Sequence, residues 1–482
     1  MRGLPTRHRH HIFGAQSGEG DDRRSRAVGL FTGGIVVAAV AAAITIPAAA
    51  ASATSSPTYW VSPSGVSTGA DTSCATAAYS TVQSAVTAAQ AAETGRSVPT
   101  IKLCSGTYTE QVTISKSLNF VRASGAVTIE LPASPVNSTT TCQTKDAATS
   151  TEVPQSVIEI CAANASGANT RGVAVSISHV TIEGEWPNSV CDDSLYDVLV
   201  EGGASLSLAD SVVTQAGAYP LNGCQGGVGV EAGFSPTGQI GHAVLVSDTI
   251  NNYQKNGITI DGADSTGYIS GVTVSGDGPT NQIAQNGIQI SFGATGTITH
   301  STITGNNYTG TGEAFATGVL VVGGGGKVCG NGVSSNPGLV RDATVTRNTL
   351  INNDVGVALF NINSKCNASV HIPTDDVACY NDIRNSHGYQ GGPSADANIS
   401  GFETKKYGAI GDQAGISDTG SHDLICHNAI SGVGYGGRDS RSELPNPKPP
   451  AWVRPIDIFS FAAAYHPVVK ANSYDGKPYI PH

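Results

Sequence analysis

The chain has 482 residues, of which 59 are Gly and only 13% are charged, and its formal net charge is −11. A hydrophobic share of 39% excludes wholesale disorder, and glycines without a three-residue period exclude a collagen helix. The acidic balance excludes a nucleic-acid or anionic-membrane partner, because both require a basic face on the protein.

Residues 1–53 have the layout of a secretory signal peptide. Six Arg and three acids precede an uncharged apolar run at residues 27–46, and small residues with Ala-x-Ala sites follow it up to Ala53. Cleavage there predicts a secreted, extracellular chain without a membrane partner. An uncleaved anchor is the alternative, since about 20 apolar residues can span a bilayer. Arg23 and Arg24 leave the twin-arginine export route open.

The segment 79–92 predicts a short amphipathic helix. Tyr79, Val82, Val86 and Ala89 would fall on one face of this helix. That face could cover the first turn of a larger β structure. Glu110, further along the chain, is expected only to close a strand.

Two short motifs repeat from residue 172 onward. The first is Gly-apolar-x-apolar, with copies beginning 25 to 38 residues apart, as in GVAVS at Gly172 and GITID at Gly257. The second is an apolar–polar–polar bend, as in ISHVTI at Ile177 and ICHNAI at Ile425. Such alternation marks short strands with one buried face, and too few hairpin dipeptides occur for propeller blades. Stacked parallel coils are therefore expected.

The segments 79–92 and 101–120 (IKLCSGTYTEQVTISKSLNF), with the later NGI and S-x-T-I units, resemble pectin-lyase-like parallel β-helices. The resemblance covers about residues 57–435. It implies an all-β fold: a single right-handed parallel β-helix (solenoid) with a short N-terminal capping helix. The catalytic motifs of pectinesterases, polygalacturonases and pectate lyases are absent, so no family residue is carried over, and the scaffold itself hosts many chemistries.

Three parts are therefore predicted: a signal peptide (1–53), the β-helix with its cap (54–436) and a Pro-rich C-terminal covering segment (437–482). The apolar stretch 452–465 is expected to cover the last coil, because an open end of stacked strands must be blunted.

The first motif also predicts a column of acids. Four residues after the start of successive copies stand Glu201, Glu231 and Asp261. Val198 and Val200 face inward by alternation, so these acids should face outward. Stacked neighbours would lie about 5 Å apart, as in retaining glycosidases, and their repulsion would create a proton donor. The alternatives are a solvated strand face and a Ca²⁺ site, since Ca²⁺ takes several oxygen ligands.

Other polar residues are candidates for substrate binding. A Trp and two acids share the loop EWPNSVCDDSLYD, an acid follows the column, and a His and an Arg occupy the same bend position on neighbouring coils. A Trp beside acids suits a sugar subsite, and packing within the loop is the alternative. The candidates are Trp186, Asp192, Asp193, Asp264, His300 and Arg347.

All ten Cys lie after the signal, which indicates disulfides in an exported protein. Equivalent slots on neighbouring coils predict one pair, since a strand spacing of about 4.8 Å is within disulfide range; a second pair is nearly level, and the others follow by elimination. The predicted pairs are Cys379–Cys426, Cys329–Cys366, Cys191–Cys224, Cys142–Cys161 and Cys74–Cys104.

The best hypothesis from the sequence is a secreted protein that cleaves or transfers glycosidic bonds of an extracellular polysaccharide through the acid column. A Ca²⁺-dependent polysaccharide lyase is the enzymatic alternative. A non-catalytic glycan-binding adhesion protein is the alternative from another class.

Overall fold

The computed structural model describes residues 56–65, 71–93, 97–144, 153–170, 172–186, 194–309, 315–324, 338–362, 373–387, 412–435, 452–458 and 467–479. The predicted signal peptide lies outside these ranges. Within them, no helix is both long and apolar enough to cross a membrane.

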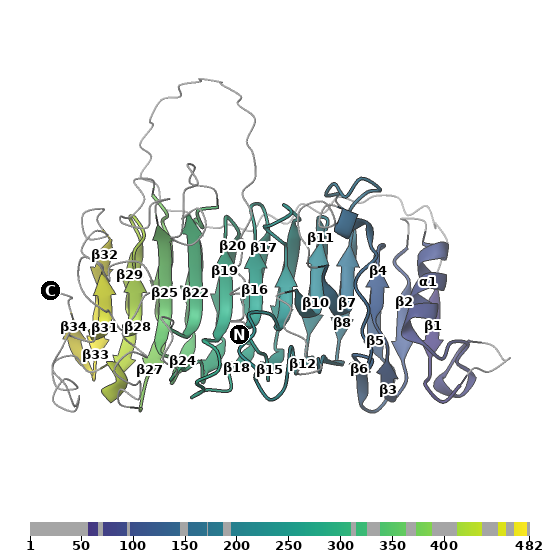
Figure 1. Ribbon diagram of the computed structural model, residues 1–482, viewed down its shortest axis with the longest axis horizontal. Helices are drawn as coiled ribbons and strands as arrows, with labels where there is room; N and C mark the ends of the chain where they lie inside the picture. The colour runs from purple at the N-terminus through teal and green to yellow at the C-terminus, as the bar shows by residue number, and fades with distance from the viewer. Residues whose placement is uncertain are drawn as a thin grey trace, which may run out of the picture. The chain divides into compact units, whose positions relative to one another are not determined.

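The described chain from residue 56 onward folds into three long sheets, to which successive coils add one strand each (Figure 1). All neighbouring strands pair in parallel except the last pair of sheet B. The predicted all-β parallel β-helix is thus confirmed.

Sheet A consists of β1 (Thr58–Val61), β2 (Thr100–Leu103), β5 (Leu118–Arg122), β8 (Ala174–Ser178), β11 (Ala204–Ala209), β14 (Gly241–Val246), β17 (Thr266–Ser270), β20 (Thr295–Thr299), β23 (Thr344–Thr346), β26 (Val377–Cys379), β29 (Leu424–Cys426) and β32 (Val468–Lys470).

Sheet B consists of β3 (Gly106–Thr109), β6 (Val127–Glu130), β9 (Thr181–Glu183), β12 (Val212–Thr214), β15 (Thr249–Asn251), β18 (Thr273–Ser275), β21 (Thr302–Thr304), β24 (Thr349–Ile351), β27 (Asp382–Arg384), β30 (Ala429–Ser431), β33 (Asn472–Tyr474) and β34 (Lys477–Tyr479).

Sheet C consists of β4 (Val112–Ile114), β7 (Gln155–Cys161), β10 (Leu195–Glu201), β13 (Val228–Ala232), β16 (Asn256–Asp261), β19 (Asn286–Ser291), β22 (Thr317–Gly324), β25 (Val355–Ile362), β28 (Asp412–Asp418) and β31 (Trp452–Ile458).

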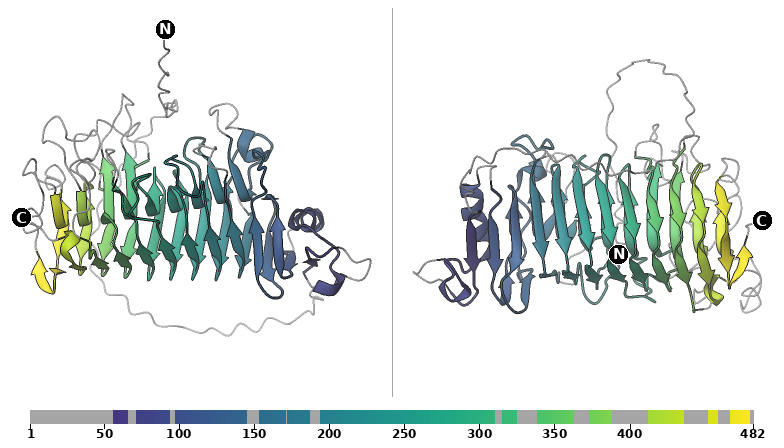
Figure 2. Two further views of the ribbon diagram at one scale, coloured as in Figure 1. Left: turned by 60° about the horizontal axis from the view of Figure 1, so that its bottom comes forward. Right: turned by 180° about the vertical axis from the view of Figure 1, so that it is seen from behind.

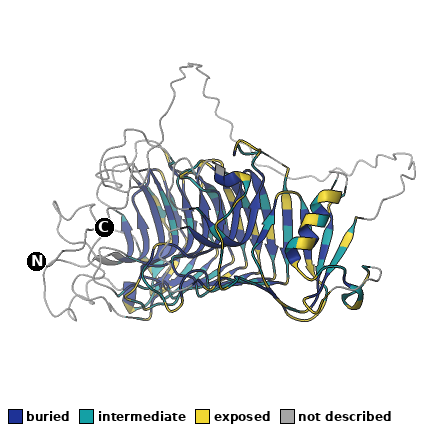
Figure 3. Cartoon of the chain, turned by 45° about the vertical axis from the view of Figure 1, so that its right-hand side comes forward, coloured by how far each residue is buried: buried dark blue, intermediate teal, exposed yellow. Residues whose placement is uncertain are grey.

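One continuous core fills the space between the sheets. Alternate residues of each strand point inward and stack on their equivalents in the next coil, as Ile258 does on Ile288. Sheet C is buried along most of its described length (Figure 3), unlike the outer faces of sheets A and B. Its outward side chains are therefore covered as well.

A short helix covers one end of the stack, as predicted (Figure 2). Helix α1 (Val82–Ala92) buries Val82, Ala85, Val86 and Ala89. Glu110 has a more specific role than closing a strand: its carboxylate accepts hydrogen bonds from the backbone N–H groups of Val82 and Gln83, at 2.7 and 2.8 Å. A carboxylate at this position satisfies the unpaired donors of the first helical turn.

The parallel strands continue into the segment that the sequence assigned to a C-terminal cover. Strand β31 extends sheet C beside β28, and β32 and β33 extend the other two sheets. Strand β34 then turns back and pairs antiparallel with β33. The parallel order therefore runs past residue 436, and a hairpin ends sheet B.

Three predicted disulfides are present: Cys74–Cys104, Cys142–Cys161 and Cys379–Cys426. Cys224 is also disulfide-bonded, and its predicted partner Cys191 lies outside the described residues. So does the predicted pair Cys329–Cys366.

A buried ladder of Asn side-chain amides fixes the bend between sheets A and B. The backbone N–H of Asn348 donates to Asn381 Oδ1, and that of Asn381 donates to Asn428 Oδ1, both at 3.0 Å. The residue before each Asn has a positive φ. On each of these coils, an exposed residue therefore comes directly before the buried Asn.

Candidate functional site

The three acids of the predicted column do not lie at equivalent positions of their three coils. Strand pairing places Glu231 beside Leu199 and Thr259. Glu201 and Asp261 come two residues after these partners, so Glu231 is two positions out of line with both. The prediction failed because Val-Gly-Val-Glu matches its neighbours equally well when shifted by two residues. A two-residue shift keeps every side chain on the same face, so alternation could not detect it.

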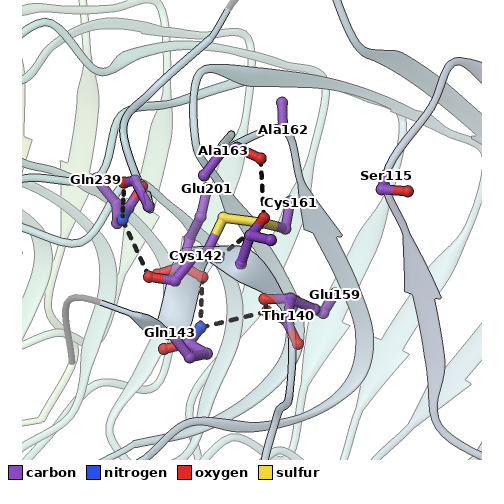
Figure 4. The surroundings of a disulfide bond; sticks show 12 residues. Ser115, Thr140, Cys142, Gln143, Glu159, Cys161, Ala162, Ala163, Glu201 and Gln239 are labelled. Carbon is purple, nitrogen blue, oxygen red and sulfur yellow. Dashed lines mark hydrogen bonds between the residues drawn. A yellow bond between two sulfur atoms is a disulfide. The ribbon is translucent and has the colours of Figure 1, made fainter. Parts of the chain in front are cut away.

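These acids are also covered rather than solvent-facing, contrary to the prediction. The exposed fractions of Glu201, Glu231 and Asp261 are 0%, 6% and 5%. Gln143, from the segment closed by the Cys142–Cys161 disulfide, donates from Nε2 to Glu201 Oε2 at 2.8 Å and to Glu159 Oε1 at 3.2 Å (Figure 4). One amide nitrogen thus bridges carboxylates of adjacent coils.

Asp261 is held in the same manner by the loop after β13. Its carboxylate accepts from the Ser235 backbone at 2.6 Å and from the Ser291 hydroxyl at 2.7 Å. Burial raises the pKa of Asp261. Burial, and then the charges of Asp261 and Glu201, raise the pKa of Glu231 well above its ordinary value. The outer face of sheet C therefore carries a buried acidic network.

The predicted substrate-binding residues are scattered. Trp186 is 1% exposed in the main core, where its Nε1 donates to Gln155 Oε1 at 3.2 Å, so its ring offers no open platform for a sugar. Asp264 is exposed in a turn after β16. His300 and Arg347 follow register-paired strands and are exposed. Asp192 and Asp193 lie outside the described residues.

An open cleft of about 470 Å³ lies where β6 and β9 end in sheet B. It is acidic, with an exposed Tyr at its wall and the Trp186 side chain reaching it from the core. The lining residues are Thr109, Glu130, Leu131, Ala133, Glu183, Glu185, Trp186 and Tyr219.

Two carboxylates of this cleft are true coil neighbours. Glu130 pairs in register with Glu183, which places their backbones one strand spacing, about 4.8 Å, apart. Thr109 Oγ1 donates to Glu130 Oε1 at 2.6 Å, and Gln215 Nε2 donates to Glu183 Oε1 at 2.8 Å. Partial burial, and then the charges of Glu130 and Glu185, raise the pKa of Glu183.

A buried acid lies behind this pair. Asp197 is fully buried, and neither of its carboxyl oxygens has a hydrogen-bond partner among the described residues. Burial, and then the charge of Glu183, raise the pKa of Asp197 well above its ordinary value. Gly184 makes the room, because a Cβ there would collide with Asp197 Oδ1 and the Trp186 ring.

The sequence does contain a signal for the cleft. Val127–Glu130 reads VTIE, and residues 180–183 read VTIE again. The bend-motif comparison ended at Ile182 and so missed the acid that follows it. No cluster of three or more His, Cys, Asp or Glu side chains with the arrangement of a metal site occurs in the described parts of the chain.

No protein-family model and no curated protein matches the chain. Among solved structures, the Dettilon tailspike protein is similar at 14% identity and a TM-score of 0.41, over 77% of this chain and 62% of that chain. DFA-IIIase from Arthrobacter chlorophenolicus A6 is similar at 11% and 0.38, over 77% and 79%. Rice weevil pectin methyl esterase follows at 14% and 0.32, over 76% and 90%. The chain thus spans less than two thirds of the tailspike chain.

Proposed function

We propose that this chain is a secreted β-helix protein that hydrolyses glycosidic bonds of an extracellular polysaccharide in the cleft around Glu130 and Glu183. The observation that carries the proposal is the register pairing of these two acids in an open cleft. Backbones one strand spacing of about 4.8 Å apart allow the two carboxyls to reach the roughly 5–5.5 Å separation of retaining glycosidases. The disulfides support export, because they persist in oxidising compartments.

The environments of the two acids assign their roles. Glu183 carries the raised pKa, so it is the group that holds a proton and gives it to the glycosidic oxygen as the bond to the anomeric carbon breaks. Glu130, oriented by Thr109, is the carboxylate that attacks the anomeric carbon. Water then displaces Glu130 from the sugar, and Glu183 takes the proton from that water.

The remaining lining residues point to an uncharged glycan. Three Glu side chains would repel a uronate, whereas Tyr219, which is 50% exposed, offers an apolar ring against which a sugar can stack. Tyr219 lies in the loop after β12 and next to Ala218, which bridges to Trp186. The buried Trp186 therefore anchors the wall that carries the exposed ring.

A glycan panel tests the proposal on the chain from residue 54, which retains the whole described β-helix. Reducing ends are measured for the parent and for Glu183→Gln, Glu130→Gln and the control Asp342→Asn, an exposed acid outside the cleft. Loss of turnover in both cleft variants, with the control unchanged, supports the proposal. Loss in Glu201→Gln or Asp261→Asn, with Glu183→Gln still active, would move the chemistry to sheet C.

Two other readouts separate the alternative functions. An ultraviolet-absorbing unsaturated product that disappears with chelator would indicate a Ca²⁺-dependent lyase. Glycan retention without turnover, unchanged in Glu183→Gln, would overturn hydrolysis and favour a non-catalytic binding protein.

A further inference from the structure

Four consecutive coils of the C-terminal half present polar side chains at one turn position. His300, Arg347, Tyr380 and His427 each follow a strand of sheet A and have φ angles between 52° and 61°. The preceding residues pair in register from β20 through β23 and β26 to β29. The four residues, called the turn row here, are therefore spaced by one strand each, about 4.8 Å.

Side chains of the turn row stack on one another. The Tyr380 and His427 rings are parallel, with an interplanar angle of 1° and centroids 4.8 Å apart. Arg347 Cζ lies 5.5 Å from the Tyr380 centroid. Arg347 and His427 belong to the coils before and after Tyr380, so they cover both faces of its ring. Tyr380 is nevertheless 52% exposed, so the stack is open to solvent.

The backbone beneath the stack is fixed on both sides. The Cys379–Cys426 disulfide joins the residues directly before Tyr380 and His427, with Cα atoms 4.6 Å apart. Directly after them, Asn428 belongs to the buried amide ladder. A row held in this way loses little conformational entropy when a ligand binds, which favours affinity.

The turn row is basic on an acidic protein. Among the described residues, no carboxylate oxygen lies within 4.0 Å of the Arg347 guanidinium, whereas Arg384 in the adjoining sheet B is ion-paired with Asp382. Nearer the N-terminus, Asp210 occupies the same turn position on the coil after His179. Its carboxylate lies 3.9 Å from the His179 ring nitrogen. The Arg347 guanidinium therefore brings an unpaired positive charge to the turn row.

We propose that the turn row binds the sulfate groups of a sulfated polysaccharide that lies along the coil axis. Guanidinium, phenol and imidazole groups all donate hydrogen bonds from their edges. The chain as a whole has a formal net charge of −11, which would repel a polyanion from most other surfaces. A sulfate ester has three terminal oxygens in different directions, so it can accept from donors on two neighbouring coils. A carboxylate, with two coplanar oxygens, fits one guanidinium. This inference is independent of the acidic cleft.

Binding of dextran sulfate to the chain from residue 54 tests the proposal, with unmodified dextran and polygalacturonate as comparison ligands. We expect dextran sulfate to bind and dextran not to bind, and binding to weaken as salt is raised. Arg347→Gln should weaken binding about tenfold, the loss of one charge-assisted contact. The matched control Arg384→Gln removes an exposed Arg that is already paired and should leave the affinity unchanged.

Tyr380→Phe separates binding from structural support, since it keeps the stacked ring and removes only the phenol donor. Weaker dextran sulfate binding at an unchanged melting temperature supports the proposal. If Arg347→Gln lowers the melting temperature and leaves the affinity intact, the row is structural and the proposal is overturned. Equal binding of polygalacturonate would overturn the sulfate assignment. Turnover of an uncharged glycan is measured in the same variants, so failure of either proposal is seen separately.

Discussion

Glu183 lies directly beside Glu130 on the neighbouring coil of sheet B, and both carboxylates line the same cleft. The two acids differ in their partners, because Glu130 accepts from a hydroxyl while Glu183 accepts from an amide and faces two acidic neighbours. A pair of carboxylates that is close, open to solvent and set in two different environments is what a two-carboxylate hydrolase requires. The acids of sheet C interact with one another, but they are buried, so a substrate cannot reach them.

Replacing the proton donor should remove most of the activity. Glu183→Gln keeps the size of the side chain and a contact with Gln215, but it has no proton to give to the leaving oxygen. We expect kcat on an unactivated glycan to fall by about 10²- to 10⁴-fold. A substrate with a good leaving group needs less protonation, so the loss on an aryl glycoside should be smaller. An equal loss on both substrates would contradict the assigned role.

Glu185→Gln should change the pH profile rather than abolish turnover. The charge of Glu185 helps to raise the pKa of Glu183, after burial and the charge of Glu130. A proton donor works below its pKa, so activity falls as pH rises through that value. Removing a neighbouring negative charge lowers this value, and the alkaline limb should move to lower pH. The limb is read from kcat against pH, and Asp342→Asn should leave it in place.

Asp248→Asn should stabilise the protein at neutral and alkaline pH. Asp248 occupies a slot that holds Asn in later coils and accepts from the backbone of Ser211 and Val246. Burial raises its pKa to about 7, so its ionisation destabilises the fold increasingly from about pH 4 to pH 7. Raising the pKa of this carboxyl from its ordinary value to about 7 corresponds to about 4 kcal/mol, and Asn loses one acceptor, worth about 1–2 kcal/mol.

The expected gain in unfolding free energy is therefore about 2 kcal/mol at pH 8, with none at pH 4, measured by denaturant titration. The control Asp264→Asn changes an exposed turn acid of the same type and should be neutral at both pH values. A gain that is the same at pH 4 and pH 8 would show that ionisation of Asp248 is not the cause.

Alternation and repeat spacing predicted the fold because a parallel β-helix places equivalent residues of each coil in columns. The same regularity allowed Cys379 and Cys426 to be paired from their matching slots. The acid column failed on register, since the two copies of Val around Gly229 align equally well two residues apart. Burial of Glu201 was beyond the sequence pattern, because its cover, Gln143, comes from 58 residues earlier in the chain.

Two buried acids near the C-terminal end of the described coils predict a second pH dependence of stability. Asp418 and Asp423 are fully buried and within hydrogen-bonding reach of each other, so one of them must carry a proton. Burial raises the pKa of Asp418 to about 6 and that of Asp423 to about 9. Both values lie above those of the unfolded chain. The pair therefore contributes its full stability below about pH 4, and this contribution is lost as pH rises from about 4 to 9, with Asp423 alone responsible above about pH 6.

Asp423→Asn tests this by replacing the proton with an amide. Asp423 Oδ1 accepts from the Thr374 hydroxyl and the Asp376 backbone, and an Asn oxygen can keep both bonds while its Nδ2 donates to Asp418. We expect the variant to lose less stability than the parent between pH 6 and 9. Hydrogen exchange of the β28 and β29 amides should follow the same difference, because both strands flank the pair. If parent and variant lose stability equally over this range, the shared proton does not set the pH dependence.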